Sequence, residues 1–256
     1  MRKAAKVTLV VMALFVLCMG AMAQDMMEGE DNPFGASASV DFYSKYIWRG
    51  WNVTDNEVVQ PAIEATMEAG PVGFLASAWA NYDTAGEHDF TEIDLTAEAS
   101  VTVAEMVSVA MGYIYYRFPQ VDLDDGENDA VSTSELYASI SAEVPASEDM
   151  DVELESAVYR DRDDGDGYYY VAGVSTAIPI AQEETVGVTL DPSVSIGFND
   201  QQWGADSSWA DMLMVLGATV SLGDYFSFGP SLNYSYALDT QYDDWFFYGI
   251  NVSAAY

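Results

Sequence analysis

Alternation of apolar and polar side chains with a period of two recurs through almost the whole chain after Gln24, and it restricts the possible folds more than any other feature. A period of two is typical of β-strands with one apolar face, and no segment after Gln24 shows a sustained helical period. Clusters of Gly, Asp, Asn and Pro interrupt the alternation. We predict twelve strands, at approximately 37–48, 58–69, 72–82, 90–102, 107–117, 134–144, 151–160, 168–178, 185–198, 209–222, 226–236 and 245–256.

The connections between these predicted strands alternate in length. The short ones are 70–71, 104–105, 145–150, 180–184 and 223–224, and the longer, acidic ones are 49–57, 83–89, 118–133, 161–167, 199–208 and 237–244. Short turns at one end and long loops at the other are the layout of a bacterial outer-membrane barrel with both termini in the periplasm. The sequence therefore predicts an all-β fold: a transmembrane, antiparallel, up-and-down β-barrel of about twelve strands.

The apolar set of each predicted strand indicates which side faces lipid. In 245–256 this set is Phe246, Tyr248, Ile250, Val252, Ala254 and Tyr256, whereas in 90–102 the set opposite the apolar side chains contains Glu92, Asp94 and Glu98. A charged group facing lipid at mid-depth costs about 3 kcal/mol, so the polar set should face a wet interior. The alternative is a soluble, lipocalin-like barrel, in which the apolar set would fill the interior.

Aromatic residues gather near the ends of the predicted strands, where amphipathic rings would meet the lipid headgroups. We predict a girdle on the loop side formed by Tyr46, Trp48, Trp51, Tyr82, Tyr115, Tyr116, Tyr159, Tyr168 and Trp245, and one on the turn side formed by Phe226, Phe228 and Tyr256.

The N-terminus has the three-part order of a cleaved secretory signal: basic residues, an apolar run from Val7 to Met19, and a small-residue site ending at Ala23. The predicted organisation is a signal peptide at 1–23, a short periplasmic segment at 24–36 and the barrel at 37–256. Cys18 raises the alternative of a lipoprotein, but Leu17 before it is too large for a lipidation site. Export to the Gram-negative outer membrane follows, with outer-membrane lipid around the barrel and the C-terminal strand, ending at Tyr256, read by the barrel-assembly machinery.

Acidity excludes one class of partner. The chain has 42 Asp and Glu residues and a formal net charge of −34, so it repels nucleic acid. Half of its residues are hydrophobic, which is not the composition of a disordered chain. A saline habitat would also explain the acidity, but not where the acids fall.

Several charged side chains are predicted to line the pore. They are Lys45, Arg49, Glu64, Glu92, Asp94, Glu98, Glu153, Glu155, Asp191 and Asp211. Lys45 and Arg49, on the first predicted strand, could oppose Glu92 and Asp94 across a constriction, or could form salt bridges that tie adjacent strands. Glu68, Glu143 and Asp151 are interpreted as solvated residues at the periplasmic rim.

No catalytic, metal or cofactor site is expected. The acidic loops at 122–129 and 161–167 resemble calcium loops in composition but lack their ligand spacing. His88 is the single histidine and lies in a predicted loop, whereas a membrane-embedded hydrolase with a Ser-His-Asp triad would need it beside a nucleophilic serine.

The first hairpin carries a family resemblance. The segment 39–50, SVDFYSKYIWRG, with Pro61 after it, resembles the opening of the TorF-type (Gcw_chp) porins, which tend to begin with a Ser-x-Tyr-x-x-Arg-Gly hairpin. Here those positions are Ser44, Tyr46, Arg49 and Gly50, and further similarity lies at 92–95, in the Tyr-rich segment 168–178 and in the terminal strand. The resemblance implies an outer-membrane barrel that forms a pore, with no settled substrate.

The predicted function is a porin-like channel for passive diffusion of small solutes, with a mild preference for cations because acids face its lumen. The alternative is a non-conducting structural or adhesive barrel, its lumen plugged by Lys45 and Arg49 bridging to inward acids. Whether the loop at 118–133 folds into the lumen, and the oligomeric state, are left open by the sequence.

Overall fold

The computed structural model describes residues 33–85, 90–104, 106–119, 131–147, 150–163 and 165–256. Its strands are β1 (Phe34–Tyr43), β2 (Tyr46–Trp48), β3 (Trp51–Thr54), β4 (Val58–Ala69), β5 (Val72–Asp83), β6 (Phe90–Ala104), β7 (Val107–Phe118), β8 (Val131–Ser147), β9 (Met150–Asp161), β10 (Gly167–Thr176), β11 (Ile178–Gln182), β12 (Val186–Asp200), β13 (Ser208–Leu222), β14 (Phe226–Ala237) and β15 (Trp245–Ala255), with a 3₁₀ turn, η1 (Gln202–Gly204), between β12 and β13.

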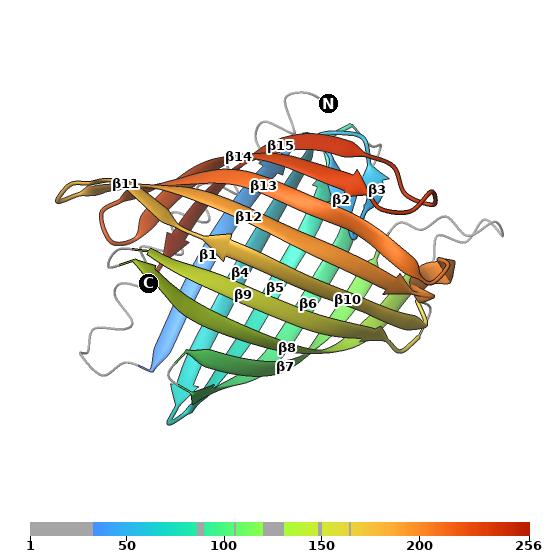
Figure 1. The fold of residues 1–256 in the computed structure, drawn as a ribbon, viewed down its shortest axis with the longest axis horizontal. Helices are drawn as coiled ribbons and strands as arrows, with labels where there is room; N and C mark the ends of the chain where they lie inside the picture. Colours follow the sequence, from blue (N-terminus) through green and yellow to red (C-terminus); the bar gives the residue numbers. More distant parts are fainter. Residues whose placement is uncertain (1–32, 86–89, 105, 120–130, 148–149, 164) are drawn as a thin grey trace.

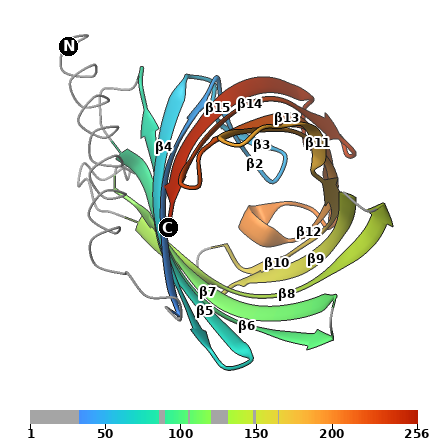
Figure 2. The ribbon, with the colours of Figure 1, turned by 90° about the vertical axis from the view of Figure 1, so that its left-hand side faces the viewer.

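These strands close into an antiparallel barrel, as the sequence predicts (Figures 1 and 2). Neighbours in sequence pair along the wall, and β1 pairs with both β4 and the last strand, β15. β10 and β11 both pair with β12, so they are two parts of one wall strand and the ring contains twelve strands. No helix in the described part of the chain is both long and apolar enough to cross a membrane.

One predicted strand extends too far. The sequence predicts the first strand at 37–48, but β1 ends at Tyr43, and residues 46–48 leave the wall as β2, which pairs only with β3. The wall itself does not need those residues, because Tyr43 already lies opposite Val58 of β4. The alternation continues through the bend at 44–45, so the period of two alone cannot show that the chain turns inward there.

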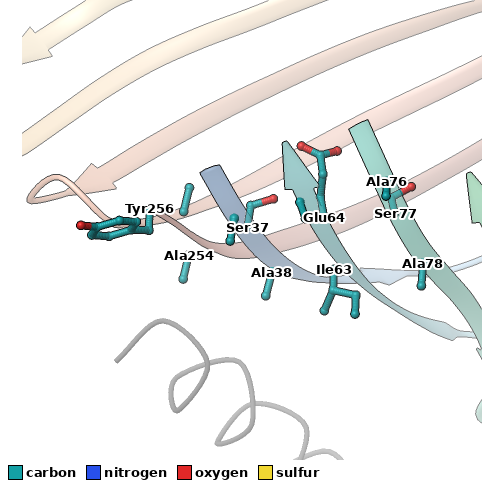
Figure 3. Close-up of a pocket in the computed structure, with 12 residues that line it drawn as sticks. Ser37, Ala38, Ile63, Glu64, Ala76, Ser77, Ala78, Ala254 and Tyr256 are labelled. Carbon is teal, nitrogen blue, oxygen red and sulfur yellow. The ribbon is translucent and has the colours of Figure 1, made fainter. Parts of the chain in front are cut away.

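Exposure follows the predicted alternation along the wall. In β15, Phe246 and Tyr248 are 56% and 57% exposed, whereas Phe247 between them is only 8% exposed. Figure 3 shows the same alternation near the turn end, with Ile63 on one side of the wall and its neighbour Glu64 on the other. Apolar side chains thus cover the outside of the barrel, as expected of a wall that faces hydrocarbon.

The predicted loop-side girdle is partly wrong. Tyr46 and Tyr116 are buried, at 8% and 6% exposed, and Trp51 and Tyr159 pack against an interior cluster. Two causes explain the error. Tyr116 and Tyr159 occupy inward positions of their strands, and Tyr46 and Trp51 belong to the hairpin that leaves the wall.

Candidate functional site

A hairpin formed by β2 and β3 lies inside the ring of strands (Figure 2). Trp48 pairs with Trp51, so Arg49 and Gly50 are the two central residues of the turn, and their φ angles are 50° and 82°. Two positive φ values define a type I′ turn, which fits a two-residue hairpin. Glycine adopts this conformation freely, whereas arginine rarely does. The turn presents the Arg49 side chain to the lumen.

Arg49 is held by a buried network. Its Nη1 and Nη2 atoms donate to the two carboxylate oxygens of Glu135, at 2.7 and 2.8 Å, and Nη1 also donates to Oε1 of Gln202 at 2.6 Å. Glu135 accepts two further hydrogen bonds, from Nε2 of Gln202 at 2.6 Å and from the hydroxyl of Tyr116 at 2.8 Å. The side chains of Arg49 and Glu135 are 9% and 0% exposed. We call these four residues the Arg49 latch.

Aromatic rings enclose the guanidinium of Arg49. Its Cζ lies 4.4 Å from the ring centroid of Trp48, 4.5 Å from that of Tyr159 and 4.6 Å from that of Tyr169, all within cation–π range. Burial lowers the pKa of Arg49, but the hydrogen bonds to Glu135 and the charge of that carboxylate raise it more, so the pKa lies above its ordinary value. Arg49 is therefore a permanent cation inside the barrel.

The latch spans the lumen because its members come from well-separated parts of the ring. The hairpin follows β1, Glu135 lies on β8, and Gln202 follows β12. Around the sheet, β4 to β7 separate β1 from β8, β9 and β10 separate β8 from β12, and β13 to β15 separate β12 from β1. Contacts that join three such points cannot run along the wall. They must cross the interior.

Gln202 reaches the latch through a strained turn. Gln201 and Trp203 have φ angles of 65° and 57°, in the left-handed region that non-glycine residues seldom occupy. The backbone N–H of Gln202 donates to Oδ1 of Asn199 at 2.8 Å, and that of Trp203 donates to the carbonyl of Gly165 at 2.6 Å. These bonds fix the turn η1, which lies inside the ring in Figure 2. Strain of this kind, held by specific contacts, is characteristic of functional sites.

The hairpin tip also packs against a small apolar cluster. Tyr169, Ala210 and Tyr242 are buried together, and Trp51 packs against Tyr242 with ring centroids 4.7 Å apart and planes tilted by 52°. Polar bonds and apolar contacts thus both hold the hairpin in place.

Lys45 and Arg49 do not share a wall strand, so the prediction that both lie on the first strand is wrong. Lys45 lies in the bend after β1 and pairs with Asp55 within the same loop. Arg49 pairs with Glu135 rather than with Glu92 or Asp94. Neither residue ties adjacent wall strands. The physical reason is the turn after Tyr43, which takes both residues out of the wall strand.

Of the other residues predicted to line the pore, Glu92, Asp94 and Asp211 lie near the hairpin, and the rest are spread along the inner face. Glu98 accepts from the hydroxyl of Tyr137 at 2.5 Å, Asp191 from Thr219 at 2.7 Å and Asp211 from Ser235 at 2.6 Å. Glu153 accepts from Ser175 at 3.3 Å. Glu155 lies on β9 opposite Gly173, Glu64 lies on β4, and Glu92 and Asp94 lie at the loop end of β6. Glu68, Glu143 and Asp151 are exposed.

Two members of the latch, Glu135 and Gln202, were missed. Glu135 could have been found, because it lies eight residues before Glu143 on β8, and residues an even number apart on a strand share one face. Nothing in the sequence indicates Gln202, since its position depends on two unusual backbone angles. His88 and residues 120–130 of the long loop lie outside the described residues. Within the described ranges, no group of three or more His, Cys, Asp or Glu side chains could hold a metal ion.

A closed antiparallel wall that is apolar outside and polar inside defines the fold as a β-barrel of the outer-membrane class. The chain belongs to the Gcw_chp family, bacterial proteins of unknown function, whose family model matches residues 27–252. The resemblance to this family is thereby confirmed, although the family description does not mention TorF or pores.

Solved barrels share the fold at low identity. An outer-membrane channel from Pseudomonas putida F1 is 11% identical, with a TM-score of 0.53 over 90% of this chain and 100% of that one. LpxR from Salmonella typhimurium is 9% identical, with a TM-score of 0.52 over 86% and 99%. The translocator domain of the autotransporter NalP from Neisseria meningitidis is 13% identical, with a TM-score of 0.52 over 97% and 96%. No curated relative matches the sequence.

Proposed function

We propose that this protein is an outer-membrane channel for small solutes, narrowed at its loop end by the Arg49 latch and mildly selective for cations. The observation that carries the proposal is the combination of an acidic inner wall with a crossing that consists of a short hairpin and a single turn. Such a crossing narrows a lumen without filling it along its length, and rings of acids attract cations.

The apolar outer face supports an outer-membrane location, and one solved barrel of similar fold is the outer-membrane channel from Pseudomonas putida F1. We further propose that residues 1–23 are removed during export and that Tyr256 marks the end of the strand read by the assembly machinery. Mass spectrometry of protein purified from outer membranes tests the first point. A mature chain that begins at Gln24 is expected, and an intact N-terminus would contradict it.

Cation preference is supported by the distribution of charge along the lumen. Glu64, Glu98 and Asp191 occupy inward positions, and the guanidinium of Arg49 is neutralised by Glu135. Unpaired acids in a low-dielectric tube raise the local concentration of cations.

Planar-bilayer recording of the purified protein tests the channel. Wild-type protein should give small conductance steps, and Arg49→Ala should give larger ones because the crossing loses its central contact. Arg160→Ala is the matched control, since Arg160 also contacts a tyrosine, Tyr168, but is exposed. It should leave the steps unchanged. Unchanged steps in Arg49→Ala would show that the latch is not the constriction.

A second candidate is a closed structural barrel, which the extent of the latch favours. In this case wild-type protein gives no conductance steps, and neither does the Arg49→Ala variant. Absence of conductance in both would overturn the channel proposal in favour of this one.

A further inference from the structure

A cavity of about 340 Å³ lies at the loop end of β7 and β8, beside Tyr116 of the latch. Five aromatic residues line it: Tyr46 and Trp48 from the hairpin, Tyr116 and Phe118 from β7, and Trp203 from η1. The charged group in its lining is Glu92 of β6, and two valines complete the wall. The cavity thus combines aromatic surface with one carboxylate.

Two carboxyl groups near this cavity have no cationic side chain paired with them within the described part of the chain. Glu92 is 6% exposed, and Asp94, two residues along the same face of β6, has a buried Oδ1 atom without a hydrogen-bond partner. The nearest guanidinium, that of Arg49, has both terminal nitrogens bonded to Glu135. A buried carboxyl group is stable in its charged form only beside a counter-charge, so a cation entering the cavity would supply what Glu92 and Asp94 lack.

The position of Trp203 in this lining is set by its backbone conformation and by its contact with Phe118. Trp203 occupies its left-handed conformation and meets Phe118 edge-on, with ring centroids 6.3 Å apart and planes at 87°. Trp203 is 39% exposed, a large exposed fraction for a tryptophan held in a strained turn. Maintaining an aromatic side chain there at a cost in backbone strain indicates a use for its ring.

We propose that this cavity binds an organic cation, a quaternary ammonium or alkylated ammonium group, which lies against the rings and is neutralised by Glu92. Aromatic faces attract such cations through their quadrupoles. A metal ion would need several oxygen ligands, and this lining offers few. The proposal deepens the proposed function, because it rests on a cation-preferring channel and names the class of solute, but binding can be measured without conduction.

Isothermal titration calorimetry of the full mature barrel in detergent tests the proposal. Choline should bind saturably, and 3,3-dimethylbutan-1-ol, which has the same shape without the charge, should bind about tenfold more weakly or not at all. Equal binding of the two compounds, or no saturable binding of choline, would overturn the proposal.

Variants locate the site. Glu92→Gln and Trp203→Leu should each weaken choline binding about tenfold, whereas Trp209→Leu, an outward-facing tryptophan that is 53% exposed, should have no effect. Heat-modifiable migration in gels verifies that each variant is a folded barrel, and Trp203→Leu keeps the test decisive if Glu92→Gln does not fold. Unchanged affinity in the folded variants would exclude this cavity as the binding site.

Conductance without choline binding contradicts only this inference, and choline binding without conductance contradicts only the proposed channel function.

Discussion

At the scale of single residues, Arg49 and Glu135 form a buried ion pair, and either charge without its partner would lower the stability of the folded protein. Removing one member of a buried ion pair typically costs about 3–5 kcal/mol, whereas replacing both with apolar residues can be almost neutral. We therefore expect Arg49→Met to lower the free energy of unfolding by about that amount. The double variant Arg49→Met, Glu135→Leu should recover most of the loss. Urea unfolding in lipid vesicles, followed by tryptophan fluorescence, measures both, and additive losses would contradict the role of the pair.

Gly50 allows a second prediction with an internal control. An added Cβ would lie 3.0 Å from Cδ1 of Tyr242 and 3.2 Å from Cβ of Asp211, at a φ of 82°. Gly70 has a similar φ of 64° but nothing within 4 Å. Gly70→Ala should cost about 1 kcal/mol for its backbone alone, and Gly50→Ala should cost distinctly more because the hairpin must also shift. Equal losses in the same unfolding measurement would show that the hairpin is loosely packed.

The sequence could indicate single residues of the latch, but not which residues meet, because the contacts join distant parts of the chain. Arg49 was singled out, and Glu135 could have been reached from Glu143 by counting in twos along β8. The pairing of Arg49 with Glu135 could not be predicted, because the two residues lie 86 positions apart. It depends on how far the hairpin reaches into the lumen.

At the scale of elements, the β2–β3 hairpin should be dispensable for folding. Tyr43 and Val58 are already opposite each other at the loop end of β1 and β4, so a two-residue Asn-Gly turn can replace residues 44–57. We expect the shortened protein to form a barrel and to give larger conductance steps than the wild type in planar bilayers. Far-UV circular dichroism and heat-modifiable migration verify the fold. A shortened barrel with wild-type conductance would place the constriction elsewhere.

The wall strands were predictable because they separate lipid from water. The elements inside the ring were not, because they lie within the lumen and meet no such boundary. A wall strand between lipid and water must alternate, and this requirement is visible in the sequence. The hairpin and η1 lie within the lumen, where polar and aromatic side chains are both acceptable. Tyr46 to Trp48 therefore looks like a continuation of β1, and the left-handed backbone of Gln201 and Trp203 leaves no sign in the sequence.

At the scale of the whole molecule, closure of the ring separates the two sets of alternating side chains, so that one set forms the outer face and the other lines the lumen. The outer face carries apolar side chains, and the inner face collects acids from many strands, so their fields add within the lumen. Acids such as Asp206, Asp224 and Asp243 are exposed in described loops and turns, where water and salt screen them. The two groups of acids should therefore differ in their effect on ion selectivity.

Neutralising three acids in each group tests this difference. The inner set is Glu64→Gln, Glu98→Gln and Asp191→Asn, and the control set is Asp206→Asn, Asp224→Asn and Asp243→Asn, all exposed in loops or turns. In a salt gradient, the inner set should lower the ratio of cation to anion permeability roughly twofold or more, and the reversal potential should move toward zero. The control set removes the same charge and should leave the reversal potential almost unchanged. If both sets shift it equally, or neither does, the acidity reflects general adaptation of the surface, as in a saline habitat, rather than selectivity.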